Sequence, residues 1–355
     1  MFECKSKLIN IFAELKTLLK TYKPGVTVLM PFYRPGRKLD DAITSIINQT
    51  YTDLELILVN NNACKTSAAI ADWYTKADHR VKQIYEPVQS VAQAMNTGLR
   101  HARADLVARM DADDFSLPDR LQEQVSYMVA NPHTGAVATQ SIFSTEIDNS
   151  KGFSLYVEWQ NRIITHREHY ISRFIESPVA QPTIMFRKEL IDLYGYYNTG
   201  NLPEDYELWL RWFEKGVRFF KIPKQLVQWN DHKERLTRVH KNYSTDAFQN
   251  VRYEYLVRWL KNNISDEKKI IVCGSSKNIM RKAEHLSALG LKIYGFTDVK
   301  PGSSAKINFM PYLEIYDPGK FFILNLISKR GVGAAIRKHF SKLGFLEGKN
   351  FILAG

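Results

Sequence analysis

The stretch LVARMDADD, residues 106–114, passes from an apolar run directly into three carboxylates. Its first five residues have the length and apolar character of a strand buried in a parallel sheet. Carboxylates this close together repel one another, which raises their pKa values, and a bound divalent cation removes that repulsion. Mg²⁺ and Mn²⁺ prefer oxygen ligands, and Mg²⁺ typically takes one or two carboxylates together with phosphate oxygens. The stretch therefore predicts a site for a metal-bound diphosphate at Asp111 and Asp113. The alternative is an acidic turn in which Asp114 caps a helix beginning at Pro118.

The chain before this stretch alternates between strand and helix patterns. The predicted strands and helices, in order, are Val26–Met30, Leu39–Asn48, Leu54–Val59, Ser67–Lys76, Val81–Tyr85 and Val91–Ala102. Such alternation predicts an α/β fold with a mostly parallel sheet flanked by helices. Ligands of these sheets bind at the carboxyl ends of the strands. Because Tyr33-Arg34, Asn60-Asn61-Asn62 and Asp111–Asp114 all follow strands, we expect these polar clusters to converge.

The segment after residue 114 is less regular. It predicts a helix at Pro118–Ala130, strands at Val137–Phe143 and Pro182–Phe186, a helix at Pro203–Lys215, a strand at Val217–Ile222 and a helix at Tyr243–Asn262. Residues 144–175 are aromatic and polar without a clear period. We expect residues 144–202 to shape part of any second substrate site.

Residues 268–355 form a second α/β pattern, preceded by a helix and linker at 243–267. Strands are predicted at Lys269–Cys273, Leu291–Thr297, Phe321–Leu326 and Phe351–Leu353, with helices at Asn278–Leu289 and Gly331–Leu343. The turn Gly274-Ser275-Ser276 and the later Asp298 are similar to a dinucleotide-binding unit, but the remaining glycines of that motif are missing. The pattern favours a small Rossmann-like domain that packs or oligomerises without a ligand, so a homo-oligomer is one expectation.

Residues 1–23 predict an amphipathic helix with an apolar stripe at Leu8, Ile11, Phe12, Leu15 and Leu18 and lysines around it. Such a helix can lie peripherally on an anionic membrane, or it can pack on its own domain or a second subunit. No stretch approaches the roughly 20 apolar residues of a membrane-spanning helix, and no secretory signal is evident.

The chain has 355 residues, a formal net charge of +12 and 3 cysteines without metal-like or disulfide-like spacing. Cysteine usage favours the cytoplasm, including the inner face of the cell membrane. The positive charge indicates an anionic partner such as a nucleotide, an acidic glycan or a membrane surface. No nucleic-acid-binding motif is present, and we expect no nucleic acid partner.

The chain from about Val26 to Arg238 resembles family 2 glycosyltransferases of the GT-A fold. The resemblance rests on VTVLMPFY (26–33), AITSIINQTY (42–51), LELILVNN (54–61), AMNTGL (94–99), ARMDADD (108–114) and PEDYELWLR (203–211). It implies a catalytic domain at residues 24–242, a nucleoside-diphosphate sugar donor with a UDP-sugar favoured, Mn²⁺ or Mg²⁺, and transfer with inversion. The acceptor it implies is a glycan or a lipid-linked molecule in cell-surface polysaccharide synthesis.

The resemblance also implies roles for individual residues. Nucleotide-sugar binding falls to Pro31, Phe32, Tyr33, Arg34, Asn61, Asn96, Arg109, Asp111, Ala112 and Asp113. Asp111 and Asp113 match the metal-binding DxD motif, and Asp114 either supports them or touches the donor sugar. Asn61 stands where the family often has Asp to read the base, and its amide offers both a donor and an acceptor. That replacement puts uridine specificity in doubt.

The acidic pair Glu204-Asp205 matches the family's acids at a helix start. Direct displacement needs a base for the acceptor hydroxyl, and the resemblance assigns this role to Asp205, with Glu204 orienting it or the acceptor. Acids in a first helical turn are also favoured by the helix dipole alone. Trp209 and Trp212 suit either an acceptor platform or the core. The polar stretch Gln228–Arg238 resembles a loop that closes over the diphosphate, with His232, Arg235 and Arg238 as its charged candidates.

Two other functions remain open. A nucleotidyltransferase also uses carboxylate-bound metal on an α/β sheet, but residues 31–37, PFYRPGR, are a poor version of its glycine-rich loop. A non-enzymatic module that binds membrane or nucleic acid would account for the positive charge and for residues 1–23.

Overall fold

The computed structural model describes residues 22–148, 150–298, 309–310, 317–329 and 331–355. The helix predicted in residues 1–23 lies outside this part of the chain, except for Tyr22 and Lys23. Among the described helices, none combines the length and the apolar character needed to cross a bilayer.

An eight-stranded sheet forms the larger part of the molecule, in the order β3-β2-β1-β4-β7-β6-β8-β5. Its strands are β1 (Val26–Phe32), β2 (Leu54–Asn60), β3 (Val81–Tyr85), β4 (Leu106–Arg109), β5 (Phe115–Ser116), β6 (Ala136–Thr145), β7 (Met185–Arg187) and β8 (Phe219–Asp231). The first four in space are parallel, β7 is antiparallel to β4 and β6, and β8 is parallel to β6. The carboxyl ends of β1, β2, β4, β6 and β8 therefore meet at one edge, and the predicted mostly parallel α/β sheet is confirmed.

Helices cover both faces of this sheet because alternate strand residues are apolar on each side. The helices α2 (Lys38–Ile47), α3 (Lys65–Ala77) and α5 (Arg120–Ala130) pack on one face. The other face carries α4 (Val91–His101), α8 (Glu189–Tyr194) and α9 (Glu204–Glu214). Residues 144–175, which gave no clear period, contain α6 (Lys151–Asn161) and α7 (His166–Ser172), and η1 (Gln181–Thr183) follows them.

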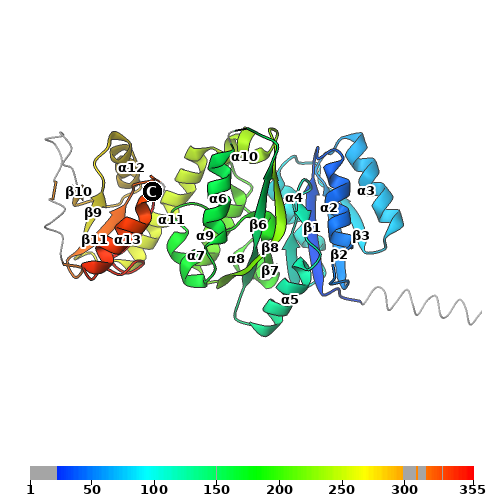
Figure 1. The fold of residues 1–355 in the computed structure, drawn as a ribbon, viewed down its shortest axis with the longest axis horizontal. Coiled ribbons are helices and arrows are strands. Elements are labelled where there is room, and N and C mark those ends of the chain that lie inside the picture. The colour runs from blue at the N-terminus through cyan, green and yellow to red at the C-terminus, as the bar shows by residue number, and fades with distance from the viewer. Residues whose placement is uncertain (1–21, 149, 299–308, 311–316, 330) are drawn as a thin grey trace, which may run out of the picture.

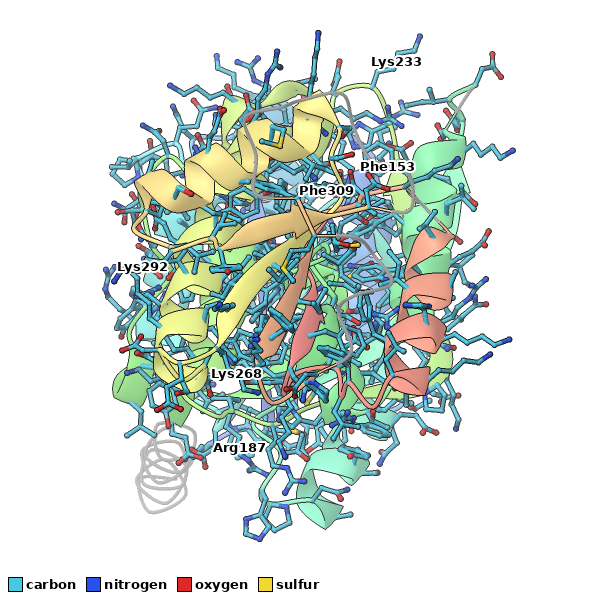
Figure 2. All side chains as sticks on the ribbon, turned by 90° about the vertical axis from the view of Figure 1, so that its left-hand side faces the viewer. Phe153, Arg187, Lys233, Lys268, Lys292 and Phe309 are labelled. Atoms are coloured by element: carbon cyan, nitrogen blue, oxygen red, sulfur yellow. The ribbon has the colours of Figure 1, made fainter. Side chains whose placement is uncertain are left out.

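A second sheet of four parallel strands lies at the other end of the molecule (Figure 1), in the order β10-β9-β11-β12. It consists of β9 (Lys269–Cys273), β10 (Gly295–Thr297), β11 (Phe321–Asn325) and β12 (Phe351–Leu353), with α12 (Lys277–Ala288) and α13 (Val332–Lys342). Figure 2 looks onto this smaller unit, with Lys292 labelled at its left edge and Lys268 near its lower end.

The two units share a hydrophobic core through α11 (Thr245–Asn263), which follows α10 (Leu236–Val239) and η2 (Lys241–Tyr243). In Figure 1, α11 stands between the two sheets. One continuous cluster joins Tyr206 of α9 and Leu256 of α11 to Val272 of β9 and Leu324 of β11. The helix thus belongs to both units.

Three of the predicted strands have the wrong bounds. The strand predicted at Val217–Ile222 extends as β8 to Asp231, because a shift of register between Thr139 and Ser141 lets β6 continue pairing with it. Gln228–Asp231 is therefore strand, and only the residues after it form the predicted loop. The strand predicted at Leu291–Thr297 is confined to β10, and the one at Pro182–Phe186 begins as η1.

Candidate active site

A cavity of about 790 Å³ opens at the carboxyl edge of the large sheet. Its wall combines residues 31–35 after β1, the residues after β4, the start of α9 and one side of α11. In Figure 1 these elements run from the middle of the large sheet toward the C-terminal unit. The predicted convergence of polar clusters at the strand ends is thus realised in one space.

Three aspartates after β4 form what we call the acidic cluster: Asp111, Asp113 and Asp114. Each offers a carboxylate oxygen, and these oxygens lie within 4.8 Å of one another. Basic side chains surround them. Arg109 Nη2 lies 2.7 Å from Asp111 Oδ1, His232 Nε2 lies 2.6 Å from Asp113 Oδ2, and Arg235 Nη2 lies 3.1 Å from Asp111 Oδ2.

Asp114 differs from the other two because it is fully buried and held by the end of β8. The backbone N–H of Asn230 donates to its Oδ1 at 2.8 Å, and Arg235 Nη1 donates to the same oxygen at 3.0 Å. Burial and the charges of Asp113 and Asp111 together raise the pKa of Asp114 to about 7, against the opposing charge of Arg235. Asp114 therefore anchors the loop after β8 to the cluster.

Asp113 behaves in the opposite way. Burial would raise its pKa, but the Arg235 charge and the hydrogen bond from His232 outweigh burial and lower the pKa to about 2. The side chains of Asp111 and Asp113 are each 21% exposed, whereas that of Asp114 is 0% exposed. The partly exposed carboxylates of Asp111 and Asp113 are thus oxygen ligands suited to a hard divalent cation. This chemistry fits Mg²⁺ or Mn²⁺.

The loop after β8 brings two of its three predicted residues to the cluster. Arg235 stacks at 4.3 Å over the ring of Trp229 and reaches all three aspartates, and His232 contacts Asp113. Arg238 instead pairs with Asp231, with its Nε 2.7 Å from Oδ1. Lys233, which directly follows His232, is exposed and points outward (Figure 2).

The residues predicted to bind the nucleotide do line the cavity: Pro31, Phe32, Tyr33, Arg34 and Asn61. The guanidinium of Arg34 lies 4.8 Å from the centre of the Tyr33 ring. The sequence predicted that the Asn61 amide offers both a hydrogen-bond donor and an acceptor to the base. In the structure, groups of the protein already occupy both. Its Nδ2 donates to the carbonyls of Glu86 and Val88 at 3.1 and 2.6 Å, which leaves only Oδ1, itself accepting from the N–H of Ser90 at 2.9 Å.

Asn96 lies outside the cavity lining, contrary to its predicted place beside the donor. Its Nδ2 donates to the carbonyl of Tyr197 at 2.9 Å, and its Oδ1 accepts from the Tyr197 N–H at 2.9 Å. This buried amide bridges α4 to the loop before α9. Arg109 and Ala112 do line the cavity, and the Arg109 carbonyl accepts from buried Arg120 at 2.7 Å.

The acidic pair Glu204-Asp205 occupies the first turn of α9 and lines the same cavity as the acidic cluster. The hydroxyl of Tyr243 donates to Glu204 Oε2 at 2.7 Å. Burial raises the pKa of both acids, with the Asp205 charge adding to the effect on Glu204 and the Asp111 charge adding to the effect on Asp205. Two acids with raised pKa values in a cavity are candidates for proton transfer.

Trp209 and Trp212 do not form an acceptor platform. Both are 0% exposed and pack in the core with Phe219, their ring centres 6.1 and 6.2 Å from its ring. The cavity takes its aromatic wall from other residues, namely Phe153, Tyr156, Trp229, Tyr243 and Phe248. The aromatic richness of residues 144–175 was the sequence signal for Phe153 and Tyr156, and it did not extend to the other three.

In the C-terminal unit, the turn after β9 uses its polar groups internally. The N–H and hydroxyl of Ser275 both donate to Asp298 Oδ2, at 2.9 and 2.7 Å. The carboxylate that a dinucleotide-binding unit would offer to a ribose therefore holds the turn itself.

Comparison with known proteins shows which family this chain resembles. Residues 27–195 match the model of "Glycosyl transferase family 2". The O-antigen biosynthesis glycosyltransferase WbnJ of Escherichia coli is 31% identical over 212 residues, which cover 58% of this chain and 80% of that protein. The putative glycosyltransferase EpsE of Bacillus subtilis is 30% identical over 228 residues, covering 63% of this chain and 79% of its own length.

A solved structure shows the same fold at low sequence identity. Residues 1–349 of TarS from S. aureus, in complex with UDP-GlcNAc, superpose with a TM-score of 0.53 and 15% identity, over 74% of this chain and 71% of that one. The fold, the order of the motifs and the relatives agree. The chain belongs to glycosyltransferase family 2, and it is a glycosyltransferase.

Proposed function

We propose that this glycosyltransferase is metal-dependent and inverting, and that it moves a sugar from a nucleoside-diphosphate donor to a hydroxyl of a glycan or lipid-linked acceptor. The observation that carries the proposal is the presence of Asp111 and Asp113 of the acidic cluster, together with the acidic pair, on the wall of one cavity. Asp111 and Asp113 would hold Mn²⁺ or Mg²⁺, which supplies positive charge to the donor's diphosphate when bound. The nucleotide would lie against Pro31, Phe32 and Tyr33.

In this proposal Asp205 is the base. The acceptor oxygen attacks the anomeric carbon while its proton passes to an Asp205 carboxylate oxygen, and the bond from that carbon to the diphosphate oxygen breaks. A single displacement from the opposite side inverts the configuration. Glu204, whose pKa burial raises to about 8, would stay protonated at neutral pH and orient the acceptor through its own O–H.

The leaving nucleoside diphosphate carries the negative charge that develops in this step. Arg235 and His232 already contact the aspartates that would hold the metal, so they would lie beside that charge. Arg238, which pairs with Asp231, is assigned no such role.

The relatives support a narrower version. WbnJ is named for O-antigen biosynthesis, and TarS was solved with UDP-GlcNAc. We propose a UDP-sugar donor and a part in cell-surface polysaccharide synthesis, at the cytoplasmic side of the membrane where lipid-linked acceptors are met.

The test is a thermal-shift screen of nucleoside diphosphates and their sugars with and without Mn²⁺. We expect stabilisation by one nucleotide together with the metal, and its loss in Asp111→Asn. No stabilisation by any pair would contradict the proposal. Release of pyrophosphate instead of nucleoside diphosphate would identify a nucleotidyltransferase.

A further inference from the structure

The wall of the cavity farthest from β1 comes from the helix that joins the two units. Thr245, Phe248 and Arg252 of α11 line the cavity at helical spacing, together with Tyr243 just before it. Further along the same stripe of the helix, Leu256 and Leu260 belong to the core shared with the C-terminal sheet. The nucleotide segment Pro31–Pro35 follows β1, across the sheet from α11 (Figure 1). The α11 wall therefore bounds the acceptor end of the cavity.

Arg252 places a positive charge on this wall. Its Nε is buried and has no hydrogen-bond partner, and no carboxylate of the described chain forms an ion pair with it. Three other cations of the lining, Arg109, Arg235 and His232, each pair with an aspartate of the acidic cluster. A partly buried guanidinium without a counter-ion favours binding of an anion from outside the chain.

A second cation strengthens this positive potential. Burial lowers the pKa of Lys282 on α12, and the charge of Arg252 lowers it further, so the two cations are near one another. Lys282 Nζ donates to the carbonyl of Leu326 at 3.2 Å and approaches Ser328 Oγ at 3.3 Å, both of which are neutral. Lys282 is therefore a second positive charge near Arg252, and its own hydrogen-bond partners are neutral.

Arg252 is not the main counter-ion of the acidic pair. Among the cations, Arg109 is the one whose charge most lowers the pKa values of Glu204 and Asp205. The phenol of Tyr206 donates to the carbonyl of Arg173, and burial raises the Tyr206 pKa while the charge of Arg252 lowers it. The guanidinium therefore lies near a neutral phenol, which does not neutralise it.

We propose that Arg252 determines acceptor specificity by binding an anionic group, a carboxylate or a phosphate, on the sugar that receives the transfer. This inference rests on the proposed function, because it assigns the α11 wall to the acceptor. A guanidinium binds a carboxylate or phosphate through two parallel N–H···O bonds, which gives direction as well as attraction. The aromatic rings of Tyr243 and Phe248 on the same wall would contact the apolar face of that sugar.

The experiment measures binding of three hexose probes by ligand-observed NMR: glucose, glucuronate and glucose 6-phosphate. The protein is first saturated with the nucleoside diphosphate and Mn²⁺ that stabilise it, so that the donor end is filled. We expect at least one anionic probe to bind the unmodified protein roughly tenfold or more tightly than glucose, the preferred probe telling carboxylate from phosphate. In Arg252→Gln that ratio should fall to near one, and Arg252→Lys should retain part of it.

Arg258→Gln is the matched control, because Arg258 lies on the same helix, is exposed and does not line the cavity. It removes the same charge and should leave the ratio unchanged. An unmodified protein that binds all three probes equally, or none, contradicts the inference, as does an unchanged ratio in Arg252→Gln. If Arg252→Gln fails to fold, a ratio in Arg252→Lys identical to that of the unmodified protein counts against a bidentate contact. Failure of the proposed function would appear earlier, as absence of stabilisation by nucleotide and Mn²⁺.

Discussion

Arg235 Nη1 lies 3.0 Å from Oδ1 of Asp114, a carboxylate 121 positions earlier in the chain. This contact fastens the loop after β8 to the end of β4. It also gives a fully buried carboxylate its cation, and without that cation the burial of Asp114 would be costly. The geometry of the cluster and the position of the loop therefore depend on the same guanidinium.

Replacing Arg235 by Ala should destabilise the metal-free protein by about 3–5 kcal/mol, because three carboxylates lose their shared cation. Mn²⁺ should then stabilise the variant more than it stabilises the unmodified protein, since the metal would replace the missing charge. Urea denaturation with and without Mn²⁺ measures both effects. Lys233→Ala, an exposed change in the same loop, should alter neither, and equal stabilisation of Arg235→Ala and the unmodified protein by Mn²⁺ would count against this role.

Asp205→Asn should lower turnover by about 10²–10⁴-fold and leave the affinity for nucleoside diphosphate and Mn²⁺ unchanged, because it removes only the proton acceptor. Turnover is measured as release of nucleoside diphosphate, and affinity by calorimetry. Asp192→Asn removes the same charge at an exposed position of α8 and should keep full activity. Undiminished turnover in Asp205→Asn would exclude that residue as the base.

The activity should rise with pH as Asp205 loses its proton, because a base must be ionised to act. Burial raises the pKa of Asp205 to about 6, so kcat/KM should fall tenfold per pH unit well below pH 6 and level off above it. A pH–rate profile at saturating Mn²⁺ checks this limb. A midpoint near 4 would instead indicate a solvent-exposed carboxylate.

Glu204 should make the stability of the protein depend on pH. Its pKa is raised from 4.5 to about 8, so the folded state holds this proton more tightly than the unfolded state. The resulting contribution is fully present below pH 4.5 and is lost as pH rises toward 8. Glu204→Gln keeps an acceptor for the Tyr243 hydroxyl, so it should melt higher than the unmodified protein at pH 8, with the difference disappearing near pH 4.5. Thermal melts across this range test the sign, and a difference that does not vary with pH would contradict it.

Asn96→Ala should lower the free energy of unfolding by about 1–3 kcal/mol, because it leaves the buried N–H and carbonyl of Tyr197 without partners. Affinity for nucleotide and Mn²⁺ should stay the same if Asn96 only joins α4 to the next loop. Denaturation and calorimetry on one preparation separate the two effects. A selective loss of nucleotide affinity would instead support the prediction that Asn96 binds the donor.

The parallel half of the sheet is readable from sequence because its strands are buried on both faces and end in polar residues. The runs ending at Met30, Val59 and Met110 therefore predict both the strands, observed as β1, β2 and β4, and the place where their ends meet. The acidic cluster follows from the same local pattern. Family resemblance added Glu204 and Asp205, which periodicity alone could not distinguish from ordinary first-turn acids.

The remaining features depend on contacts between distant segments. Trp209 and Trp212 are core residues because Phe219 and Phe186 pack on them, and nothing in the α9 sequence shows which face meets those rings. Likewise the continuation of β8 to Asp231 depends on a change of register opposite β6. The engagement of the Asn61 amide depends on backbone groups at residues 86–90, which are invisible to a local pattern.

Because the first turns of α11 close the cavity while its later turns complete the core of the C-terminal unit, the chain cannot be divided between the two sheets without damage to both. A fragment ending before residue 245 would lose a wall of the cavity, and one ending after α11 would expose Leu256 and Leu260 to water. Recombination with a relative that brings a different C-terminal unit must therefore bring its own version of this helix. A change of acceptor and a change of the second domain would then be inherited together.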